Sequence, residues 1–178
     1  MDVTRETKRA ERRRHEVPSV AIVGYTNAGK SSLLNRLTGA GVLVDDALFA
    51  TLDPTTRRAA ATDGRVYTLT DTVGFVRHLP HDLVEAFAST LEESTQADLL
   101  VHVVDGSDPD PIGQINAVRA VLATIGAADI PELIVINKVD RAAVDALTML
   151  QTSFPDAVFV SARTGEGIDQ LRAAIESH

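Results

Sequence analysis

The stretch of the sequence with the clearest chemical potential is a short loop bounded by glycines. Its residues are Gly24, Tyr25, Thr26, Asn27, Ala28, Gly29, Lys30 and Ser31. The loop follows an apolar run of strand length at 19–23 and precedes a helical stretch at 32–37. Glycines let backbone N–H groups turn inward, and the N-terminus of the following helix adds the positive end of its dipole. The pattern GxxxxGK[ST] in this context predicts a loop that binds a chain of phosphates.

Three side chains at the end of this loop have the chemistry that a bound triphosphate needs. Lys30 is expected to bridge the β- and γ-phosphates, and Ser32 is expected to lie beside the α-phosphate. Ser31 offers a hydroxyl to Mg²⁺, a hard cation that prefers oxygen ligands. The structural alternative is a turn that only joins a strand to a helix. It is disfavoured because further motifs fall at strand ends.

A second motif, Asp71-Thr72-Val73-Gly74, follows the apolar run at 66–70. Asp71 is therefore expected at the carboxyl end of a strand, where it can hold Mg²⁺ through water. Gly74 can donate its backbone N–H to the γ-phosphate. An aspartate at the end of a strand is often only a turn former, but together with the phosphate loop it indicates a metal site.

Two later segments have the donors and acceptors that recognise guanine. They are residues 137–140 (Asn137, Lys138, Val139 and Asp140) and residues 161–163 (Ser161, Ala162 and Arg163). The Asp140 carboxylate can accept from guanine N1–H and from the 2-amino group, a donor pair that adenine lacks, and the Asn137 amide can bind the opposite edge. Lys138 can pack its aliphatic stem along the base and the ribose. The backbone N–H of Ala162 can bind guanine O6.

Strand-like and helix-like segments alternate along the chain. Apolar runs of strand length lie at 19–23, 66–70, 99–105, 132–137 and 157–160, and helical spacing is clearest at 112–125 and 168–175. Asp63-Gly64, between 58–62 and 65–70, indicates a hairpin and hence one antiparallel strand. The pattern predicts a three-layer α/β fold with a mainly parallel six-stranded sheet, one antiparallel strand and helices on both faces. Ligands are expected at the carboxyl ends of the strands.

The composition is that of one globular domain preceded by a charged segment. The chain has 178 residues, 44% of them hydrophobic, and no cysteine, which excludes disulfides and a catalytic thiol and suits the cytoplasm. No apolar run approaches the roughly 20 residues that span a bilayer, so no membrane partner is expected.

Residues 1–16 hold six basic against four acidic groups, whereas the whole chain has a net charge of −8. They read as a basic linker helix, the tail of a missing N-terminal domain, and not as a DNA-binding element. The compact domain is expected at 17–178.

Four stretches make the chain resemble the translation-factor-related P-loop GTPases, and among them the HflX family. They are GYTNAGKSSLLNRLTG at 24–39, LFATLDPTTR at 48–57, DTVGFVRHLPHDLVEAFASTLEE at 71–93 and SARTGEG at 161–167. The second and third are specific, because Era and TrmE proteins share GxxNxGKS but are not expected to carry them. The resemblance covers about residues 5–177. It implies a cytoplasmic, Mg²⁺-dependent G domain, expected to be monomeric, from a GTPase that binds the large ribosomal subunit and rescues or splits ribosomes under stress.

The threonine of switch I that coordinates Mg²⁺ and senses the γ-phosphate has three candidates, Thr51, Thr55 and Thr56. Matching LFATLD to the FTTL type of segment in Obg-like relatives favours Thr51. Matching DPTT to the Ras-like DPT favours Thr55. We choose Thr51, and Thr55 remains the alternative.

The expected reaction is hydrolysis of GTP to GDP and phosphate. Ras-like enzymes orient the attacking water with a glutamine after the DxxG glycine, where this chain has Phe75. Hydrolysis is therefore expected to be slow, with Lys30, Gly74, other backbone N–H groups and Mg²⁺ stabilising the charge. One alternative is a nucleotide-binding module with negligible hydrolysis. Another, an ATPase or small-molecule kinase with the same loop, is disfavoured by Asp140.

Asn27 suggests a second cation. Similar GTPases with GxxNxGKS use this asparagine to help bind K⁺ where an arginine finger would otherwise act, so the resemblance implies K⁺ stimulation. The alternative is a local hydrogen bond that stabilises the loop.

Overall fold

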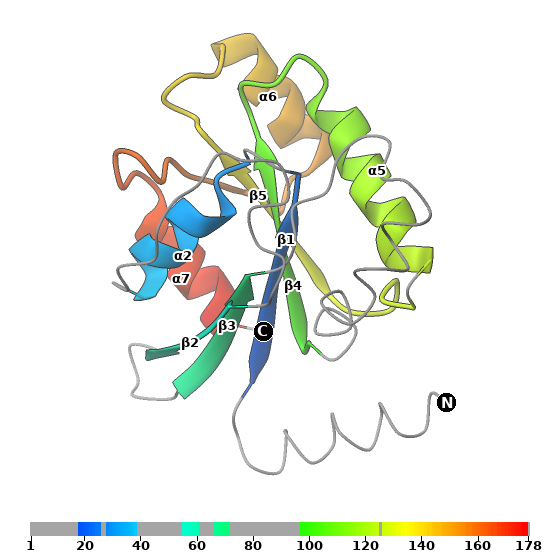
Figure 1. Ribbon diagram of the computed structural model, residues 1–178. Coiled ribbons are helices and arrows are strands. Elements are labelled where there is room, and N and C mark those ends of the chain that lie inside the picture. The colour runs from blue at the N-terminus through cyan, green and yellow to red at the C-terminus, as the bar shows by residue number, and fades with distance from the viewer. Residues whose placement is uncertain are drawn as a thin grey trace.

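The computed structural model describes residues 18–25, 28–38, 55–60, 66–71, 97–124 and 126–177 of the chain. Its strands are β1 (Ser19–Gly24), β2 (Thr55–Ala60), β3 (Val66–Asp71), β4 (Leu99–Asp105), β5 (Glu132–Asn137) and β6 (Val158–Phe159). They form one six-stranded sheet in the order β2-β3-β1-β4-β5-β6 (Figure 1). The pairs along β3, β1, β4, β5 and β6 are parallel, and β2 runs antiparallel to β3. The predicted mainly parallel sheet is confirmed.

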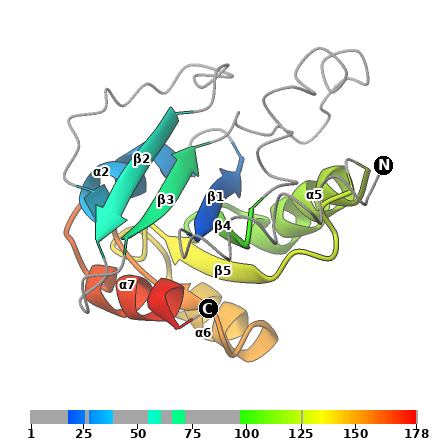
Figure 2. The same cartoon turned by 90° about the horizontal axis from the view of Figure 1, so that it is seen from below.

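Helices cover both faces of this sheet, so the predicted three layers are also confirmed (Figures 1 and 2). In the part of the chain that the structure describes, they are α2 (Lys30–Thr38), α5 (Pro111–Thr124), α6 (Val144–Ser153) and α7 (Ile168–Glu176). α2 and α7 lie on one face, where Leu33 and Leu171 share a core with Ile22 of β1. α5 and α6 lie on the other, where Ile115 and Leu150 share a second core.

The central strand β1 shows how the sequence places the site. All six of its residues are buried and all except Ser19 are apolar, as expected of a parallel strand whose two faces are both covered by helices. Side chains alternate along it: Val20 and Ile22 belong to the α2–α7 core, and Ala21 and Val23 to the α5 core. The carboxyl end of β1 therefore emerges at Gly24, between the two helical layers.

Three elements differ from the expectation. β2 spans Thr55–Ala60 instead of 58–62, because its extent is set by its ladder with β3, a long-range pairing that local pattern does not reveal. β6 is shorter than 157–160, since this edge strand pairs with β5 at only two positions. α6 was not predicted: Leu150 is its buried residue and Val144 is 78% exposed, so it has no broad apolar stripe. Asp63-Gly64 and the linker predicted at 1–16 lie outside the described residues.

Candidate nucleotide-binding site

The phosphate loop leaves the carboxyl end of β1 at Gly24 and enters α2 at Lys30. Gly29 has a φ of +95°, in the left-handed region that glycine adopts without strain. A Cβ at Gly29 would also collide with the side-chain nitrogen of Asn137. The Gly29 carbonyl then accepts the first helical hydrogen bond, from Leu33 N at 2.9 Å. Glycine is therefore needed at position 29 for two reasons: the backbone turns there, and the side chain of Asn137 lies against it.

Asn137 joins three segments that are far apart in the sequence. It ends β5 and is 2% exposed. Its Nδ2 donates to the carbonyl of Ala28 in the phosphate loop at 2.9 Å, and its Oδ1 accepts from the backbone N–H of Ala162 at 3.0 Å. Both polar atoms of the amide are thus hydrogen-bonded within the protein, and the phosphate loop and the two predicted guanine segments lie together.

Asp140 is held by the segment that follows β6. Ser161 Oγ donates to Asp140 Oδ1 at 2.8 Å and accepts from Thr164 N at 3.1 Å. Val139 N donates to the carbonyl of Val160 at 3.2 Å, which ties the backbones of the two segments together. The carboxylate that was predicted to read the base is therefore oriented by contacts within the protein.

Lys138 is fixed by a residue that was not predicted from the sequence. Its φ is +62°, and its Nζ lies 3.3 Å from Oδ2 of Asp105, the last residue of β4. The other oxygen of Asp105 accepts from Ser107 N at 2.9 Å and from Ser107 Oγ at 2.6 Å. The signal was present, because Asp105 ends a strand just as Asp71 does, and polar groups at the carboxyl ends of parallel strands meet at one edge.

The residues predicted to handle phosphate and metal lie at the same edge. Lys30 is 8% exposed at the start of α2, and Ser31 and Ser32 follow it, half-buried. Asp71 ends β3 and pairs in register with Ile22 of β1, close to the start of the phosphate loop. Thr26, Asn27, Thr51 and Gly74 lie outside the described residues.

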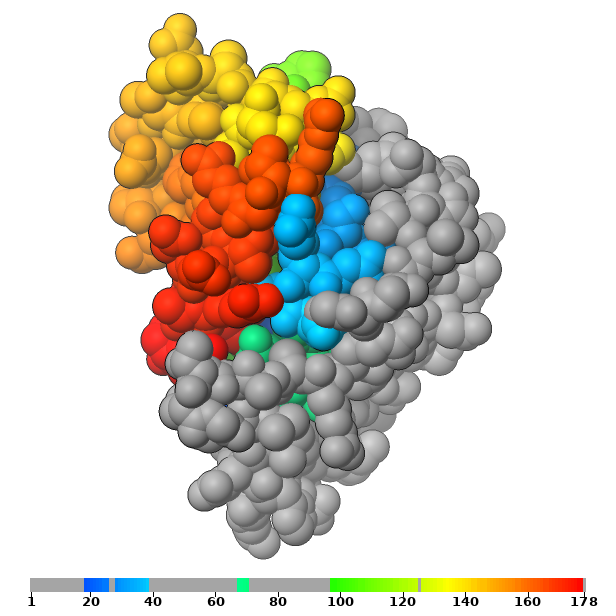
Figure 3. Space-filling model, turned by 90° about the vertical axis from the view of Figure 1, so that its left-hand side faces the viewer, coloured from blue at the N-terminus to red at the C-terminus, as the bar shows by residue number. Residues whose placement is uncertain are grey.

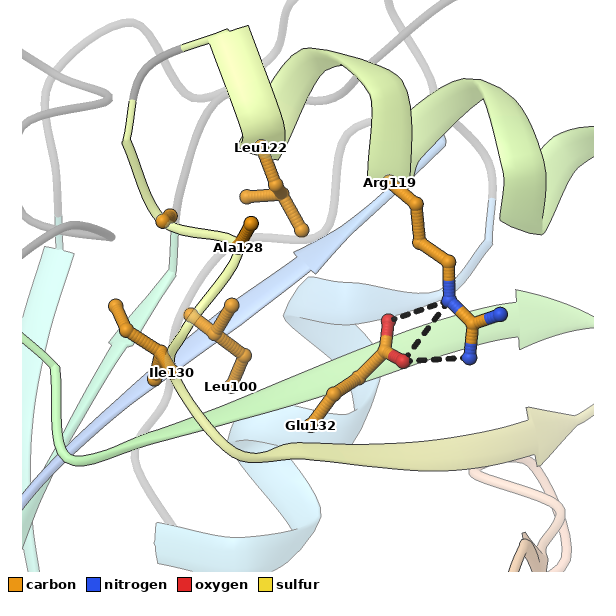
Figure 4. Close-up of a pocket in the computed structure, with 7 residues that line it drawn as sticks. Leu100, Arg119, Leu122, Ala128, Ile130 and Glu132 are labelled. Carbon is orange, nitrogen blue, oxygen red and sulfur yellow. Dashed lines mark hydrogen bonds and ion pairs between the residues drawn. The ribbon is translucent and has the colours of Figure 1, made fainter.

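A separate pocket of about 220 Å³ lies at the other end of the sheet (Figure 4). Arg119 of α5 and Glu132 at the start of β5 form one side, and Leu100, Leu122 and Ile130 lie opposite. Because Leu100 and Glu132 stand near the amino ends of their strands, this pocket is remote from the phosphate loop.

The charged side of this pocket runs from the exposed Arg119 through the half-buried Glu132 to the buried His102. Glu132 accepts from Arg119 at 2.7 and 3.0 Å, and its Oε2 lies 2.8 Å from Nδ1 of His102, which is 1% exposed. Burial alone would raise the pKa of Glu132, but the hydrogen bonds and charges of His102 and Arg119 outweigh it and lower the pKa from 4.5 to about 2. His102 is therefore a core residue whose ring has a side-chain partner.

The described helices include none that is both long and apolar enough to cross a bilayer.

Comparisons with known proteins agree with this geometry. Residues 19–138 match the model of a family described as 50S ribosome-binding GTPase. The GTPase HflX of Caldanaerobacter subterraneus subsp. tengcongensis is 51% identical over 97% of this chain and 39% of its own length. The GTPase HflX of Escherichia coli strain K12 is 50% identical over 96% of this chain and 41% of its own length. This chain therefore spans about two-fifths of the curated relatives that it matches.

A solved structure shares the fold as well. The GDP complex of a GTP-binding protein from the archaeon Sulfolobus solfataricus aligns with a TM-score of 0.69 and 31% identity, over 90% of this chain and 51% of that one. The family match covers most of the chain, and the residues that it spans include the phosphate loop and Asn137. The chain belongs to the 50S ribosome-binding GTPases, as an HflX-family G domain.

Proposed function

We propose that this site binds GTP, hydrolyses it slowly to GDP and phosphate, and thereby switches association with the large ribosomal subunit. The observation that carries the proposal is the Asn137 amide, which joins Ala28 of the phosphate loop to Ala162 at 2.9 and 3.0 Å. A ligand whose phosphates occupy the loop would have Asp140 and Lys138 within reach of its base.

Phosphate binding is supported by the charge at the start of α2. Lys30 lies where the helix dipole is already positive, and the first turn contains no acidic residue. A buried positive charge there is stabilised by an anion, and a triphosphate supplies one. We propose that Lys30 bridges the β- and γ-phosphates and that residues 24–31 donate backbone N–H groups. As the γ-phosphate leaves, Lys30 and the N–H of Gly74 would stabilise the charge on its oxygens.

Guanine recognition is assigned to the groups around Asn137. Asp140 would accept from N1–H and the 2-amino group, and the bond that its Oδ1 accepts from Ser161 Oγ at 2.8 Å would orient the carboxylate. Lys138 would lie along the base, with its ammonium held by Asp105. The N–H of Ala162, which donates to Asn137 Oδ1, would become a donor shared with guanine O6. Arg163 would flank the base as the next residue of the segment.

The available donors fit Mg²⁺, which prefers hydroxyl, carboxylate and phosphate oxygens. Ser31 supplies a hydroxyl at the start of α2, and Asp71 ends the neighbouring strand, from where it would act through water. Among the described residues no group of three or more His, Cys, Asp or Glu could hold a metal alone. This agrees with a site completed by phosphate oxygens. When bound, the ion would neutralise charge on the β- and γ-phosphates.

The switch I threonine is proposed to be Thr51. Thr55 and Thr56 belong to β2, and their backbones pair with Asp71 and Thr70 of β3. A residue held in a sheet ladder cannot follow the arrival and departure of a γ-phosphate as a loop residue does. Thr51 lies four positions before the strand and outside the described residues, and it remains our choice.

The proposal also includes a partner, the large ribosomal subunit, whose association with this protein would depend on the bound nucleotide. Loss of γ-phosphate contacts would release the segments that the sequence places at 40–58 and 74–93, and a ribosome could read that change. Residues 55–58 of the first segment belong to β2. The family description names the 50S subunit, which supports this partner and a cytoplasmic location. Phe75, in place of a water-orienting glutamine, supports a slow intrinsic rate and keeps a nucleotide-binding module with negligible hydrolysis as the second candidate.

Competition titrations with GTP, GDP and ATP, with and without Mg²⁺, test the binding proposal. We expect guanine nucleotides to bind at least about 100-fold more tightly than ATP, and Asp140→Asn to shift preference toward xanthosine nucleotides. Asp145→Asn, at an exposed position on α6, is the matched control. Equal affinity for ATP and GTP would contradict the base assignment. Tight GTP binding without phosphate release would favour the binding module.

A further inference from the structure

Arg36 makes two long-range hydrogen bonds beside the site that the proposed reaction does not use. It lies in the last turn of α2, the helix that begins with Lys30. Its Nε donates to the carbonyl of Ala162 at 2.7 Å, and its Nη2 donates to the carbonyl of Arg163 at 2.7 Å. One guanidinium therefore donates to two successive carbonyls, which lie 126 and 127 residues later in the chain.

The two bonds fix the direction of the peptide planes beside the base-reading donor. A guanidinium is planar and presents its N–H groups in a rigid fork, so two bonds of this kind determine orientation as well as distance. In a trans peptide the N–H points away from the C=O. By drawing the carbonyl of Ala162 toward α2, Arg36 also aims the N–H of Arg163 away from α2, and it restrains the backbone that carries the Ala162 N–H.

The segment 161–165 depends on such a restraint because it is irregular. Arg163 and Thr164 are exposed, and Gly165 has a left-handed φ of +89° with Arg36 Nη1 3.5 Å from the position of a Cβ. Figure 3 shows this segment, in orange, lying against α2, in blue, with α7, in red, below it. The segment is therefore docked on the helix that follows the phosphate loop.

The backbone of Arg36 is in turn bonded to a residue of α7. Arg172 of α7 donates from Nη2 to the backbone carbonyl of Arg36 at 2.8 Å. A cation at this place also compensates the negative end of the α2 dipole. Arg172 thus supports the backbone of α2 but does not bond to the carbonyls of Ala162 or Arg163 in the contacts described, which makes it a natural control.

We infer that Arg36 is a positioning residue for guanine specificity. It holds the backbone of Ala162, whose N–H is proposed to bind guanine O6, in place relative to α2. This inference rests on the proposed assignment of Ala162 and Asp140 to guanine. It predicts that loss of Arg36 weakens recognition of O6 selectively. Recognition of the 2-amino group should persist, because Asp140 is tied through Ser161 and through the Val139–Val160 backbone pair.

The test compares three diphosphates on the full chain: GDP, 6-thio-GDP, which changes only O6, and IDP, which lacks only the 2-amino group. In wild type we expect both analogues to bind more weakly than GDP. In Arg36→Ala we expect about tenfold weaker GDP binding, a GDP to 6-thio-GDP ratio near one, and an unchanged GDP to IDP ratio. Arg36→Lys, which keeps the charge but lacks the planar fork that fits both carbonyls, should be intermediate. Arg172→Ala should keep both ratios.

The outcomes separate the inference from the assignment beneath it. If the wild type binds GDP more tightly than 6-thio-GDP and Arg36→Ala keeps that preference, Arg36 does not position the Ala162 N–H that is proposed to bind O6. If all three diphosphates weaken equally, Arg36 has a general structural role and the inference fails. A wild-type protein that binds all three equally would overturn the guanine assignment itself.

Discussion

Asn137 donates from Nδ2 to the carbonyl of Ala28 at 2.9 Å, across 109 residues of sequence and within the buried interior. The same side chain accepts from Ala162 N at 3.0 Å. A residue expected to read the edge of a base therefore also acts as the internal brace between the phosphate loop and the base-reading segments. Binding and stability are coupled at this position.

Asn137→Ala should lower both stability and nucleotide affinity. The change leaves the carbonyl of Ala28 and the N–H of Ala162 without this partner in a buried site, which costs about 1–3 kcal/mol for each unsatisfied group. Denaturant unfolding of the nucleotide-free protein measures this loss. Asn116→Ala, at an exposed position on α5, should change the free energy of unfolding by less than about 0.5 kcal/mol. Equal stability of the two variants would show that the brace is energetically unimportant.

Asp105→Asn should weaken GTP and GDP binding together. The ion pair with Lys138 is 3.3 Å long and its side chains are only 25% and 20% exposed, so its loss frees the lysine from its position along the base. We expect a loss of affinity of about threefold to tenfold, with the ratio of GTP to GDP affinity unchanged. Asp108→Asn, in the same turn, is the control. A change confined to GTP would instead place Asp105 in γ-phosphate chemistry.

Glu132 should make stability depend on acid pH. Its pKa is lowered in the folded protein from 4.5 to about 2, because the bonds from His102 and Arg119 overcome the opposing effect of burial. The unfolded chain therefore binds a proton at higher pH than the folded protein does, and stability from the ionised carboxylate is present above pH 4.5 and lost as pH falls toward 2. The shift corresponds to at most a few kcal/mol.

Denaturant unfolding across this pH range measures the Glu132 contribution. Glu132→Gln should be less stable than wild type at neutral pH, and its stability should fall less steeply below pH 4.5. Asp129→Asn, exposed in the loop before β5, should follow the wild-type curve. Parallel curves for wild type and Glu132→Gln would mean that Glu132 does not cause the acid sensitivity.

K⁺ should stimulate phosphate release if Asn27 helps to hold it. We expect turnover in KCl to exceed that in matched NaCl by about 100-fold, the scale on which one group that stabilises transition-state charge acts. Asn27→Ala should remove the difference and leave the NaCl rate nearly unchanged. Identical wild-type rates in the two salts would end this hypothesis and leave Asn27 with a local role in the loop.

Much of the fold and of the site's location follows from the sequence alone. Strand-length apolar runs that alternate with amphipathic helices lead to a parallel sheet covered on both faces, as the buried strand β1 illustrates. Motifs placed directly after such strands must meet at one edge, because parallel strands share their carboxyl ends. Gly24, Asp71 and Asn137 each end a strand, as that reasoning requires.

Other features were decided only by the tertiary structure, because they depend on pairing between distant segments. The ladder with β3 determines that β2 begins at Thr55, and no local pattern marks that start. Arg36 resembles an ordinary surface charge in the sequence. Asp105 can be recognised as the end of a strand, but nothing in the sequence marks its pairing with Lys138. The partners of Arg36 and Asp105 lie 126 and 33 residues away. A side chain acquires such a role from the distance and direction of the groups that folding brings to it, and these are properties of the packed chain.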